Sequence, residues 1–372
     1  MLNHSLNNDS RVNLLSVSVL GVVSAVGISE NALVLWAVGF HVRRTVSAVW
    51  VLNLALSDFL ATLTLPLFTY YLYSSHSWEL GQALCVAQSA IFFLNMFVSA
   101  FLLAAISLDR YLMVSRPVWS QTRRSVGAAW AVSGLGWLWA GLNTLPYAVF
   151  RQVMPKADNR TLCYHNFALH PSGAGLDADC RLRQTATALS KLLLAFLVPM
   201  AVIAGSYTGF AHSLRERERA RQRRSSSSSS YQTVSRQFSR MVASVIAAFV
   251  LCWAPYHLFC MLEVAAQDWT LGVKLVEVGL PLATIFSFLS PILNPAIYAF
   301  SCPDFCNRIR HSLGALLEAL VEEESAGGST HRKGTKLRRG TPSPNASHLL
   351  SSNASMNSYQ FRHCQDRDSQ EK

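Results

Sequence analysis

Charged residues are scarce in this chain of 372 residues. Only 14% of its residues are Asp, Glu, Lys or Arg, whereas 51% are hydrophobic, and soluble domains usually carry about 25% charged residues. This shortage excludes the two or three soluble domains that the length alone would suggest. The apolar residues instead form blocks of twenty or more, long enough to cross a hydrocarbon core of about 30 Å as helices. The sequence therefore predicts a helical membrane protein.

Motifs for catalysis and transport are also missing. The sequence has no His/Glu pair at zinc spacing, no glycine loop that would cradle phosphate and no nucleophile elbow. It has too few intramembrane charges for a channel or transporter, and no paired broken helices in related halves. We therefore expect neither an enzyme nor a bound organic cofactor.

Seven apolar blocks predict an all-α membrane protein, a seven-transmembrane helix bundle over residues 13–299. A short segment, 1–12, precedes it. Residues 300–320 have apolar side chains at helical spacing, which predicts a short amphipathic eighth helix along the inner leaflet. The polar tail, 321–372, is predicted to be disordered. The expected spans are 13–39, 46–73, 83–115, 126–149, 186–213, 236–264 and 272–299.

Basic residues predict the orientation of these spans. Arg43 and Arg44 follow the first span, Arg123 and Arg124 follow the third, and the loop after the fifth is denser in arginine still. Because cytoplasmic loops are enriched in Lys and Arg, we expect an extracellular N-terminus and a cytoplasmic C-terminus in the plasma membrane. The net charge of +11 fits contact with inner-leaflet lipids, so it does not require nucleic acid as a partner.

Glycosylation sequons agree with this orientation. Asn3, Asn8 and Asn159 each begin an Asn-X-Ser/Thr triplet in a segment expected outside the cell, which makes them candidate glycosylation sites.

Three of the eight cysteines are expected to be extracellular. Cys85, at the start of span three, and Cys163, in the loop after span four, form the candidate disulfide. Cys180 is then left over. Cys302 and Cys306 follow span seven beside basic residues, where palmitoylation is expected.

Five short motifs occur in order along the spans. They are "NLALSD" in span two, "SLDRYLMVSRP" at the end of span three, "WLWAGLNTLP" in span four, "CWAPYH" in span six and "NPAIY" closing span seven. An Asp-Arg pair alone could simply be a solvated helix end. Together the motifs resemble the rhodopsin-like family of G-protein-coupled receptors, over about residues 28–315.

The resemblance implies roles for matching residues. Asn31 would anchor span one. Activation and G-protein coupling would involve Asp109, Arg110, Tyr111, Phe249, Trp253, Tyr207, Pro295 and Tyr298. Pro199, Pro255 and Pro295 each leave a backbone carbonyl free inside a helix, which predicts kinks.

The resemblance also implies an allosteric sodium site in the middle of the membrane. A buried carboxylate such as that of Asp58 needs either a proton or a cation. The alternative is that neighbouring side chains satisfy Asp58 without an ion. The implied ligand set is Asp58, Asn95, Ser99, Ser290 and Asn294.

The absence of certain charges excludes several ligand classes. Span three has no acidic residue between positions 86 and 108, and Phe92 lies at the depth where amine receptors carry an aspartate. A cationic amine is therefore not expected. Span seven has no lysine for a retinal Schiff base, and it lacks the arginine with which most prostanoid receptors hold a carboxylate.

The charges in the outer half of the bundle instead favour an anionic ligand. Lys191 in span five, Arg151 and Arg160 are set against one acid, Glu263 in span six. A lysine within a span costs about 2.5–3.5 kcal/mol on insertion scales, so we expect Lys191 to anchor a carboxylate. The alternatives are that Lys191 pairs with Glu263 or extends to the headgroups.

The neighbours of these charges are apolar and aromatic, which suits a lipid with one carboxylate. Cys252 and Cys260, in span six, are expected to be packing residues. The expected neighbours are Phe68, Tyr71, Phe92, Phe93, Tyr164, Tyr256 and Leu280.

The stretches "HSWELG", "FFLNMF" and "SKLLLAFLVP" are similar to the leukocyte chemoattractant receptors, in the branch that binds prostaglandin D2. This resemblance implies inhibitory G protein as the partner, with lower cyclic AMP, calcium mobilisation and chemotaxis. Receptor kinases and arrestin would act on the tail and on serines 225–230. The chain departs from that pattern at His165, where a second tyrosine is expected, at Tyr207, where a histidine is expected, and at the unpaired Cys180.

Two alternatives to a lipid receptor remain. The same cations could hold the C-terminal carboxylate of a chemoattractant peptide. A scavenger that does not signal is the other alternative, and the intact Asp109-Arg110-Tyr111 and Asn294-Pro295 motifs argue against it.

Overall fold

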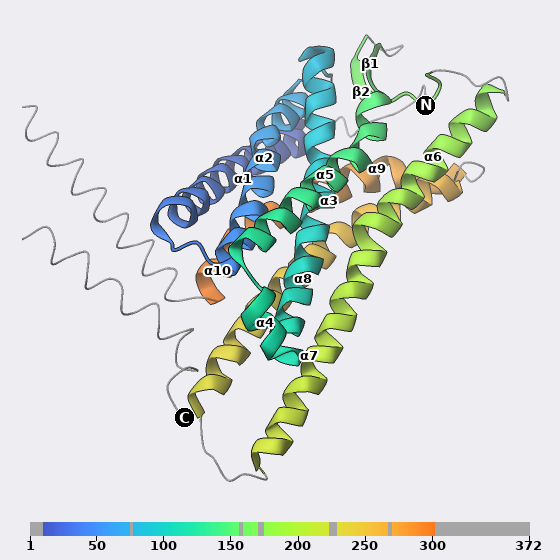
Figure 1. Ribbon diagram of the computed structural model, residues 1–372. Helices are drawn as coiled ribbons and strands as arrows, with labels where there is room; N and C mark the ends of the chain where they lie inside the picture. Colours follow the sequence, from blue (N-terminus) through green and yellow to red (C-terminus); the bar gives the residue numbers. More distant parts are fainter. Residues whose placement is uncertain are drawn as a thin grey trace, which may run out of the picture.

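The protein is a bundle of long helices with a β-hairpin at one end (Figure 1). The computed structural model describes residues 10–74, 77–155, 159–169, 175–222, 229–266 and 270–301. Asn3, Asn8, Cys302, Cys306 and the tail lie outside this part of the chain, as does the predicted eighth helix beyond Ser301. The side chain of Tyr298 is likewise not described.

The helices follow the predicted spans closely. α2 and α5 begin and end at the predicted residues, whereas the fifth span is extended at both ends. The elements are α1 (Ser10–Trp36), continued by the π-helical turn η1 (Ala37–His41), α2 (Val46–Tyr73), α3 (Gly81–Ser115), α4 (Pro117–Arg123), α5 (Val126–Val149), α6 (Leu176–Leu192), the π-helical turn η2 (Leu193–Leu197), α7 (Val198–Gln222), α8 (Ser229–Ala265), α9 (Thr270–Ser287) and α10 (Ser290–Ser301).

Six segments of these helices are long and apolar enough to cross a membrane. α5, which is the predicted fourth span, is not among them, because its Trp, Gly, Ser and Asn residues lower its hydropathy. Its 24 residues nevertheless extend about 36 Å at 1.5 Å per residue, which is enough to span the hydrocarbon core.

Polar caps fix the starts of two helices. The Thr45 hydroxyl accepts a hydrogen bond from the backbone N–H of Ala48, and Ser125 does the same for Ala128. Such caps satisfy N–H groups that have no partner within the helix. Both helices therefore begin directly after the basic loops.

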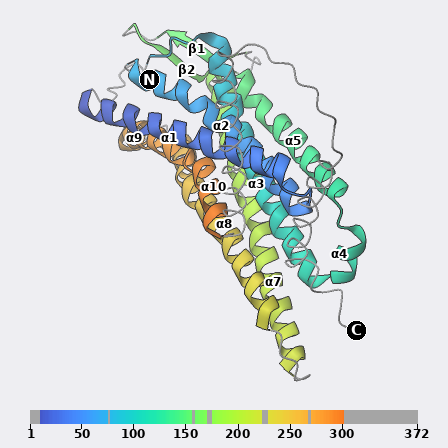
Figure 2. The same cartoon turned by 90° about the vertical axis from the view of Figure 1, so that its left-hand side faces the viewer.

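α3 lies at the centre of the bundle, in contact with α2, α5 and α7 (Figure 2). Close packing against α5 depends on Gly136, because a Cβ at that position would lie 2.4 Å from the Phe101 ring. α3 therefore packs closely against its neighbours, and many of its side chains are buried.

The seventh span is broken, but not at its Asn294-Pro295 motif. α9 ends at Ser287 and α10 begins at Ser290, so the break lies at Phe288–Leu289, just before Pro291. Pro295 lies inside α10 and cannot donate to the carbonyl of Pro291. The amide of Asn31 donates to that carbonyl instead, at 3.0 Å, which joins α1 to α10.

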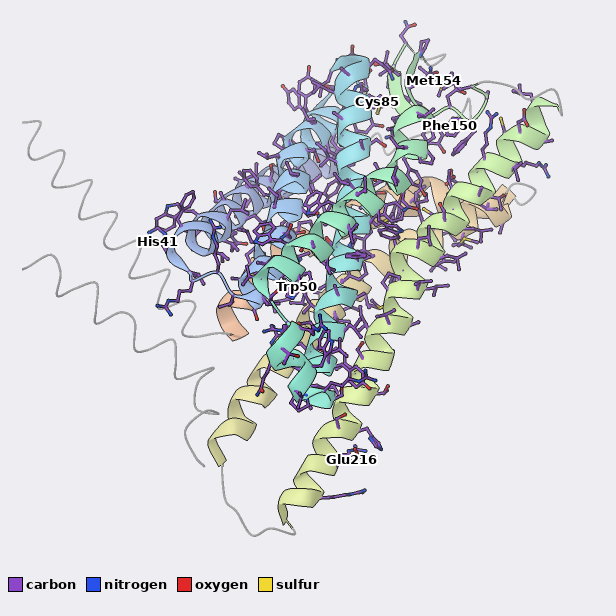
Figure 3. All side chains as sticks on the ribbon, viewed as in Figure 1. His41, Trp50, Cys85, Phe150, Met154 and Glu216 are labelled. Carbon is purple, nitrogen blue, oxygen red and sulfur yellow. A yellow bond between two sulfur atoms is a disulfide. The ribbon has the colours of Figure 1, made fainter. Side chains whose placement is uncertain are left out.

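A two-stranded hairpin was not predicted by the sequence analysis. β1 (Arg151–Pro155) and β2 (Thr161–His165) pair antiparallel, with Val153 opposite Cys163. Figure 3 places Phe150, Met154 and Cys85 at one end of the bundle and Glu216 of α7 at the other. The hairpin therefore covers one end of the helices.

Candidate ligand-binding site and signalling core

Lys191 points into the bundle. Its side chain is on the last turn of α6, and only 8% of the residue is exposed. Its Nζ donates to Sγ of Cys260 on α8 at 3.4 Å. Nζ also lies 5.5 Å from the ring centroid of Phe93, 5.6 Å from that of Tyr147 and 5.4 Å from that of Tyr256. Aromatic faces attract a cation at such distances.

Neither alternative role for Lys191 matches this geometry. Glu263 accepts a hydrogen bond from the hydroxyl of Tyr164 at 2.8 Å, and Lys191 forms no ion pair with any described residue. Its low exposure also excludes an extension to the headgroups in this structure. The lysine is a buried cation held by a thiol and three aromatic rings.

Arg151 brings a second cation to the base of the hairpin. Its Nε donates to Sγ of Cys163 at 3.2 Å, and its Nη1 lies 3.1 Å from Nδ1 of His165. Burial lowers the pKa of Arg151 to about 10, so it stays protonated at neutral pH. Within the described ranges this guanidinium has no carboxylate partner either.

His165 contacts Arg151 and lies within the electrostatic reach of Lys191. Burial, and then the charges of Arg151 and Lys191, hold the pKa of this imidazole well below its ordinary value of 6.5. A neutral ring lets Nδ1 accept from Arg151, while its buried Nε2 has no hydrogen-bond partner among the described residues. The ring stacks on Phe167, with centroids 5.7 Å apart.

Tyr164 connects the hairpin to α8 through Glu263. Burial, followed by the charge of Glu263, raises the pKa of the Tyr164 phenol. The phenol therefore stays protonated and donates to the carboxylate. Glu263 is thus engaged with the hairpin and neutralises neither Lys191 nor Arg151.

Phe92 connects Tyr256, which lies beside Lys191, to Trp253 of α8. Its ring centroid lies 5.6 Å from that of Tyr256, 5.4 Å from that of Trp253 and 5.1 Å from that of Phe288. A ligand that contacts Phe92 can therefore act on Trp253 through one aromatic ring. The ring centroid of Trp253 in turn lies 6.2 Å from that of Phe249.

The other predicted ligand-binding residues lie near the contacts of Lys191 and Phe92. Leu280, Phe68 and Tyr71 pack against the core from α9 and α2. Arg160 lies just before β2, and its charge acts on Tyr71 together with that of Arg151. The structure therefore brings the predicted residues to one end of the bundle.

Three residues of this region were missed by the sequence analysis. Tyr147 stacks on Phe93 with centroids 4.1 Å apart, and its hydroxyl lies 2.8 Å from that of Ser190. Cys260 was expected only to pack, and His257 was not singled out. An aromatic residue with a polar tip in the outer half of a span is a signal that could have identified Tyr147 in "LPY" and His257 in "PYH".

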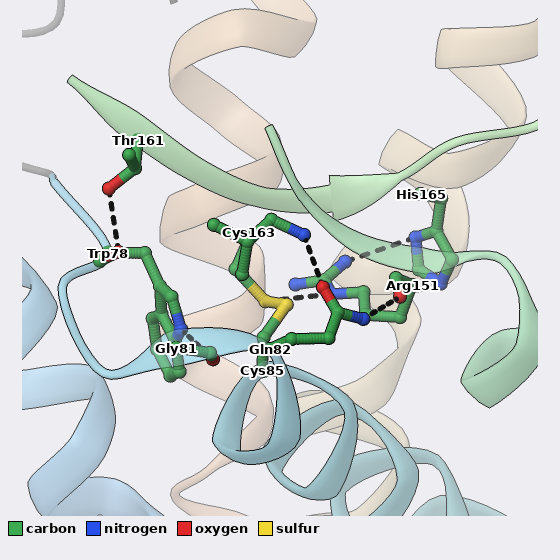
Figure 4. Close-up of a disulfide and its surroundings, with 9 residues drawn as sticks. Trp78, Gly81, Gln82, Cys85, Arg151, Thr161, Cys163 and His165 are labelled. Carbon is green, nitrogen blue, oxygen red and sulfur yellow. Dashed lines mark hydrogen bonds between the residues drawn. A yellow bond between two sulfur atoms is a disulfide. The ribbon is translucent and has the colours of Figure 1, made fainter. Parts of the chain in front are cut away.

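The predicted disulfide is confirmed, and it holds the hairpin over the bundle (Figure 4). Cys85 of α3 bonds to Cys163 of β2, with Cα atoms 5.7 Å apart. The side-chain amide of Gln82 donates to the carbonyl of Arg151 and accepts from the N–H of Val153, both at 2.8 Å. Thr161 is tied to Trp78 as well, through two hydrogen bonds. Cys180 is a free thiol.

The middle of the bundle holds Asp58 in a network of amides. Asn95 donates to Oδ1 at 3.0 Å, and Asn294 donates to Oδ2 at 2.8 Å. Asn95 also contacts the hydroxyl of Ser99 at 3.4 Å, and Ser290 is buried one turn before Asn294. Neighbouring side chains thus satisfy Asp58 in this structure, which is the alternative to an ion.

The same residues fit a sodium ion. Oδ1 of Asn294 is buried without a hydrogen-bond partner among the described atoms. Together with the carboxylate of Asp58 and the hydroxyls of Ser99 and Ser290, it provides the oxygen donors that a hard cation requires.

At the other end of α3, Asp109 forms two hydrogen bonds with Arg124, at 2.8 and 3.1 Å. Its distance to Arg110 is longer, 3.7 Å. Nη2 of Arg110 donates to the hydroxyl of Ser47 at 2.6 Å. Arg124, which the sequence analysis used only for orientation, is therefore the closer partner of Asp109.

Comparison with known proteins agrees with this arrangement. Residues 30–298 match the family described as "7 transmembrane receptor (rhodopsin family)". Prostaglandin D2 receptor 2 of Mus musculus is 46% identical over 342 residues, 91% of this chain and 86% of that protein. The same receptor of Rattus norvegicus is 45% identical over 323 residues, 87% and 77% of the two chains. Chemerin-like receptor 2 of Mus musculus is 32% identical over 318 residues, 86% and 84% of the two chains. The chain therefore belongs to the rhodopsin family of seven-transmembrane G-protein-coupled receptors, which are multi-pass membrane proteins and not enzymes.

Proposed function

We propose that this receptor recognises an anionic lipid, prostaglandin D2 or a close relative, and signals through inhibitory G protein. The observation that carries the proposal is Lys191, a buried cation with no carboxylate partner among the described residues, surrounded by three aromatic rings. The relatives at 45–46% identity are prostaglandin D2 receptors, which supports the same ligand.

Electrostatics favours a carboxylate in this pocket. Among the described residues, the buried Lys191 and the half-buried Arg151 have only a thiol, a disulfide sulfur, an imidazole and aromatic rings as partners. A ligand carboxylate would provide charge-assisted hydrogen bonds to either of them, and these are about twice as strong as neutral ones. The apolar chain of the lipid would lie along Phe92, Tyr256 and Leu280.

The proposed signal passes from the lipid through Phe92 to Trp253 and Phe249. Arg110 would then leave Ser47 and Asp109 to engage the G protein at the cytoplasmic end. The N-terminus would be extracellular, in the plasma membrane, and the response would be lower cyclic AMP, calcium mobilisation and chemotaxis. Receptor kinases and arrestin would end it.

Inhibition of cyclic AMP in transfected cells tests the ligand. Prostanoids and chemoattractant peptides would be applied to receptor whose surface expression has been measured. A response to prostaglandin D2 is expected. A response to peptides alone would favour the peptide alternative and overturn this proposal, and so would no response to prostaglandin D2 in well-expressed receptor.

Substitution of Lys191 tests the anchor separately. Lys191→Gln is expected to weaken binding of the radiolabelled lipid by roughly tenfold or more, since a charged hydrogen bond contributes about 1.5–3 kcal/mol. Arg181→Gln, which removes an exposed charge from the same helix, is the matched control and should leave binding unchanged. Equal affinity in both variants would remove Lys191 from the site.

A further inference from the structure

A buried thiol lies beside the proposed carboxylate anchor. Cys260 is free and only 2% exposed, and its Sγ is 3.4 Å from Nζ of Lys191. Cys252, two turns earlier on the same helix, is equally buried at 2%, but no lysine contacts it in the described part of the chain. Recognition of a carboxylate does not require this Cys–Lys pair.

The pair has the chemistry of an activated nucleophile. The thiolate is the reactive form of cysteine, and an adjacent ammonium group stabilises it. Tyr256 also hydrogen-bonds with Cys260, but Lys191 is the charged group that contacts its sulfur among the described residues. Cys252 has the same burial without that charge, and it should therefore stay inert.

A second observation indicates that a ligand occupies this part of the pocket. His257 precedes Cys260 by three residues, which places the two side chains on the same face of α8. The histidine is 2% exposed, yet neither of its ring nitrogens has a hydrogen-bond partner among the described residues. Buried polar groups usually have such a partner, and a polar group of a ligand would provide one.

We propose that Cys260 captures carboxylate lipids that also contain an α,β-unsaturated ketone, by forming a covalent bond with them. The proposal rests on the proposed function, because it requires the lipid to bind in this pocket. Arg151 would hold the carboxylate beneath the hairpin. Lys191 would then hydrogen-bond to the ketone oxygen instead, next to the attacking sulfur.

The reaction needs no oxidant or other co-reactant. Sγ of Cys260 forms a bond to the β-carbon, and the π pair of the C=C bond moves towards the ketone oxygen as an enolate. The thiol gives its proton to water before the attack, Lys191 stays an ammonium group throughout, and the α-carbon of the enolate takes a proton back from water. Lys191 thus stabilises first the thiolate and then the enolate, and the product is a neutral thioether.

The test uses purified full-length receptor and two synthetic probes. One is a twenty-carbon fatty acid with an enone and a terminal alkyne, and the other is its saturated ketone analogue. The enone probe is expected to add its own mass once per receptor, at Cys260 by peptide mapping. The saturated analogue should bind reversibly, compete with the labelling and leave no adduct.

Variants separate the covalent step from binding. Cys260→Ser and Cys260→Ala should abolish the adduct, whereas Cys252→Ser should be labelled like the unsubstituted chain. Lys191→Gln should slow labelling by roughly tenfold, because it removes the ammonium group that stabilises the attacking thiolate. Labelling at any other cysteine, or unchanged labelling in the Cys260 variants, would overturn the proposal.

The saturated analogue also separates a failure of the covalent step from a failure of the proposed function. If it binds but the enone probe forms no adduct, the covalent inference fails and the proposed function stands. If it does not bind to folded receptor, the proposed function itself fails.

Discussion

At the scale of single residues, His165 makes the hairpin sensitive to acid. Its imidazole contacts Arg151, and Tyr164 is next to it in the strand. Burial, and then the charges of Arg151 and Lys191, hold its folded-state pKa well below the ordinary value of 6.5. The unfolded chain therefore binds a proton below about pH 6.5 that the folded chain does not bind. Stability is fully present above that pH and falls as the pH is lowered.

We expect the melting temperature of detergent-purified receptor to fall between pH 7 and about pH 5. The contribution of His165 has a limit of about 1.4 kcal/mol per pH unit for one proton. His165→Phe keeps a ring that can stack on Phe167 and should flatten part of the pH dependence. His212→Phe, an exposed histidine on α7, is the control. An identical pH profile in all three proteins would rule out this role of His165.

The residues of the candidate site could be predicted from the sequence better than their partners. A lysine in an apolar span stands out in the sequence, because placing its charge in the membrane costs free energy that a specific contact must offset. Its contacts with Cys260 and Tyr147 depend on how α5, α6 and α8 face one another, which no local pattern determines. The same holds for Glu263, whose partner is Tyr164 on the unpredicted hairpin.

At the scale of the helices and strands, Asn31 shows how one side chain fastens α1 to α10. Its amide donates to the carbonyl of Pro291, which the missing N–H of Pro295 leaves free. Asn31→Ala would leave that buried carbonyl unpaired, at a cost of about 1–3 kcal/mol. A lower melting temperature in detergent is the expected result.

Asn143→Ala is the matched control for this substitution. Among the described residues its amide donates only to the carbonyl of Trp139 in its own helix, at 2.8 Å, so its loss separates no pair of helices. We expect little change in melting temperature. If the two variants are destabilised equally, the hydrogen bond between α1 and α10 contributes no more to stability than a bond within one helix.

The spans were predictable because hydrophobic length is a local property of the sequence. α2 and α5 begin and end where predicted, and in the structure Thr45 and Ser125 cap their first turns. The hairpin was missed because its strands are short and half-buried, and they are held by the disulfide and Gln82 rather than by an apolar face. The break before Pro291 was missed because Pro295 is the more familiar signal.

At the scale of the whole molecule, the network around Asp58 connects three helices in the middle of the bundle. Asn95 of α3 and Asn294 of α10 both donate to this carboxylate of α2. An ion that binds Asp58 would hold these helices in one arrangement. We expect the agonist to favour a different arrangement of these helices from the one that the ion holds. Because such coupling between two sites is reciprocal, sodium should weaken agonist binding.

Asp58→Asn should abolish this effect of sodium on agonist affinity. The substitution removes the carboxylate that balances the charge of the ion but keeps a side chain that can accept and donate hydrogen bonds. Competition binding in sodium chloride and in an equal concentration of a bulky organic cation provides the measurement. Ser57→Ala is the control, since Ser57 contacts Asn95 but is not among the proposed ligands, and it should retain the sodium effect. A sodium effect that survives in Asp58→Asn would mean that the ion binds elsewhere, and the amide network would then be sufficient to explain how the buried carboxylate is tolerated.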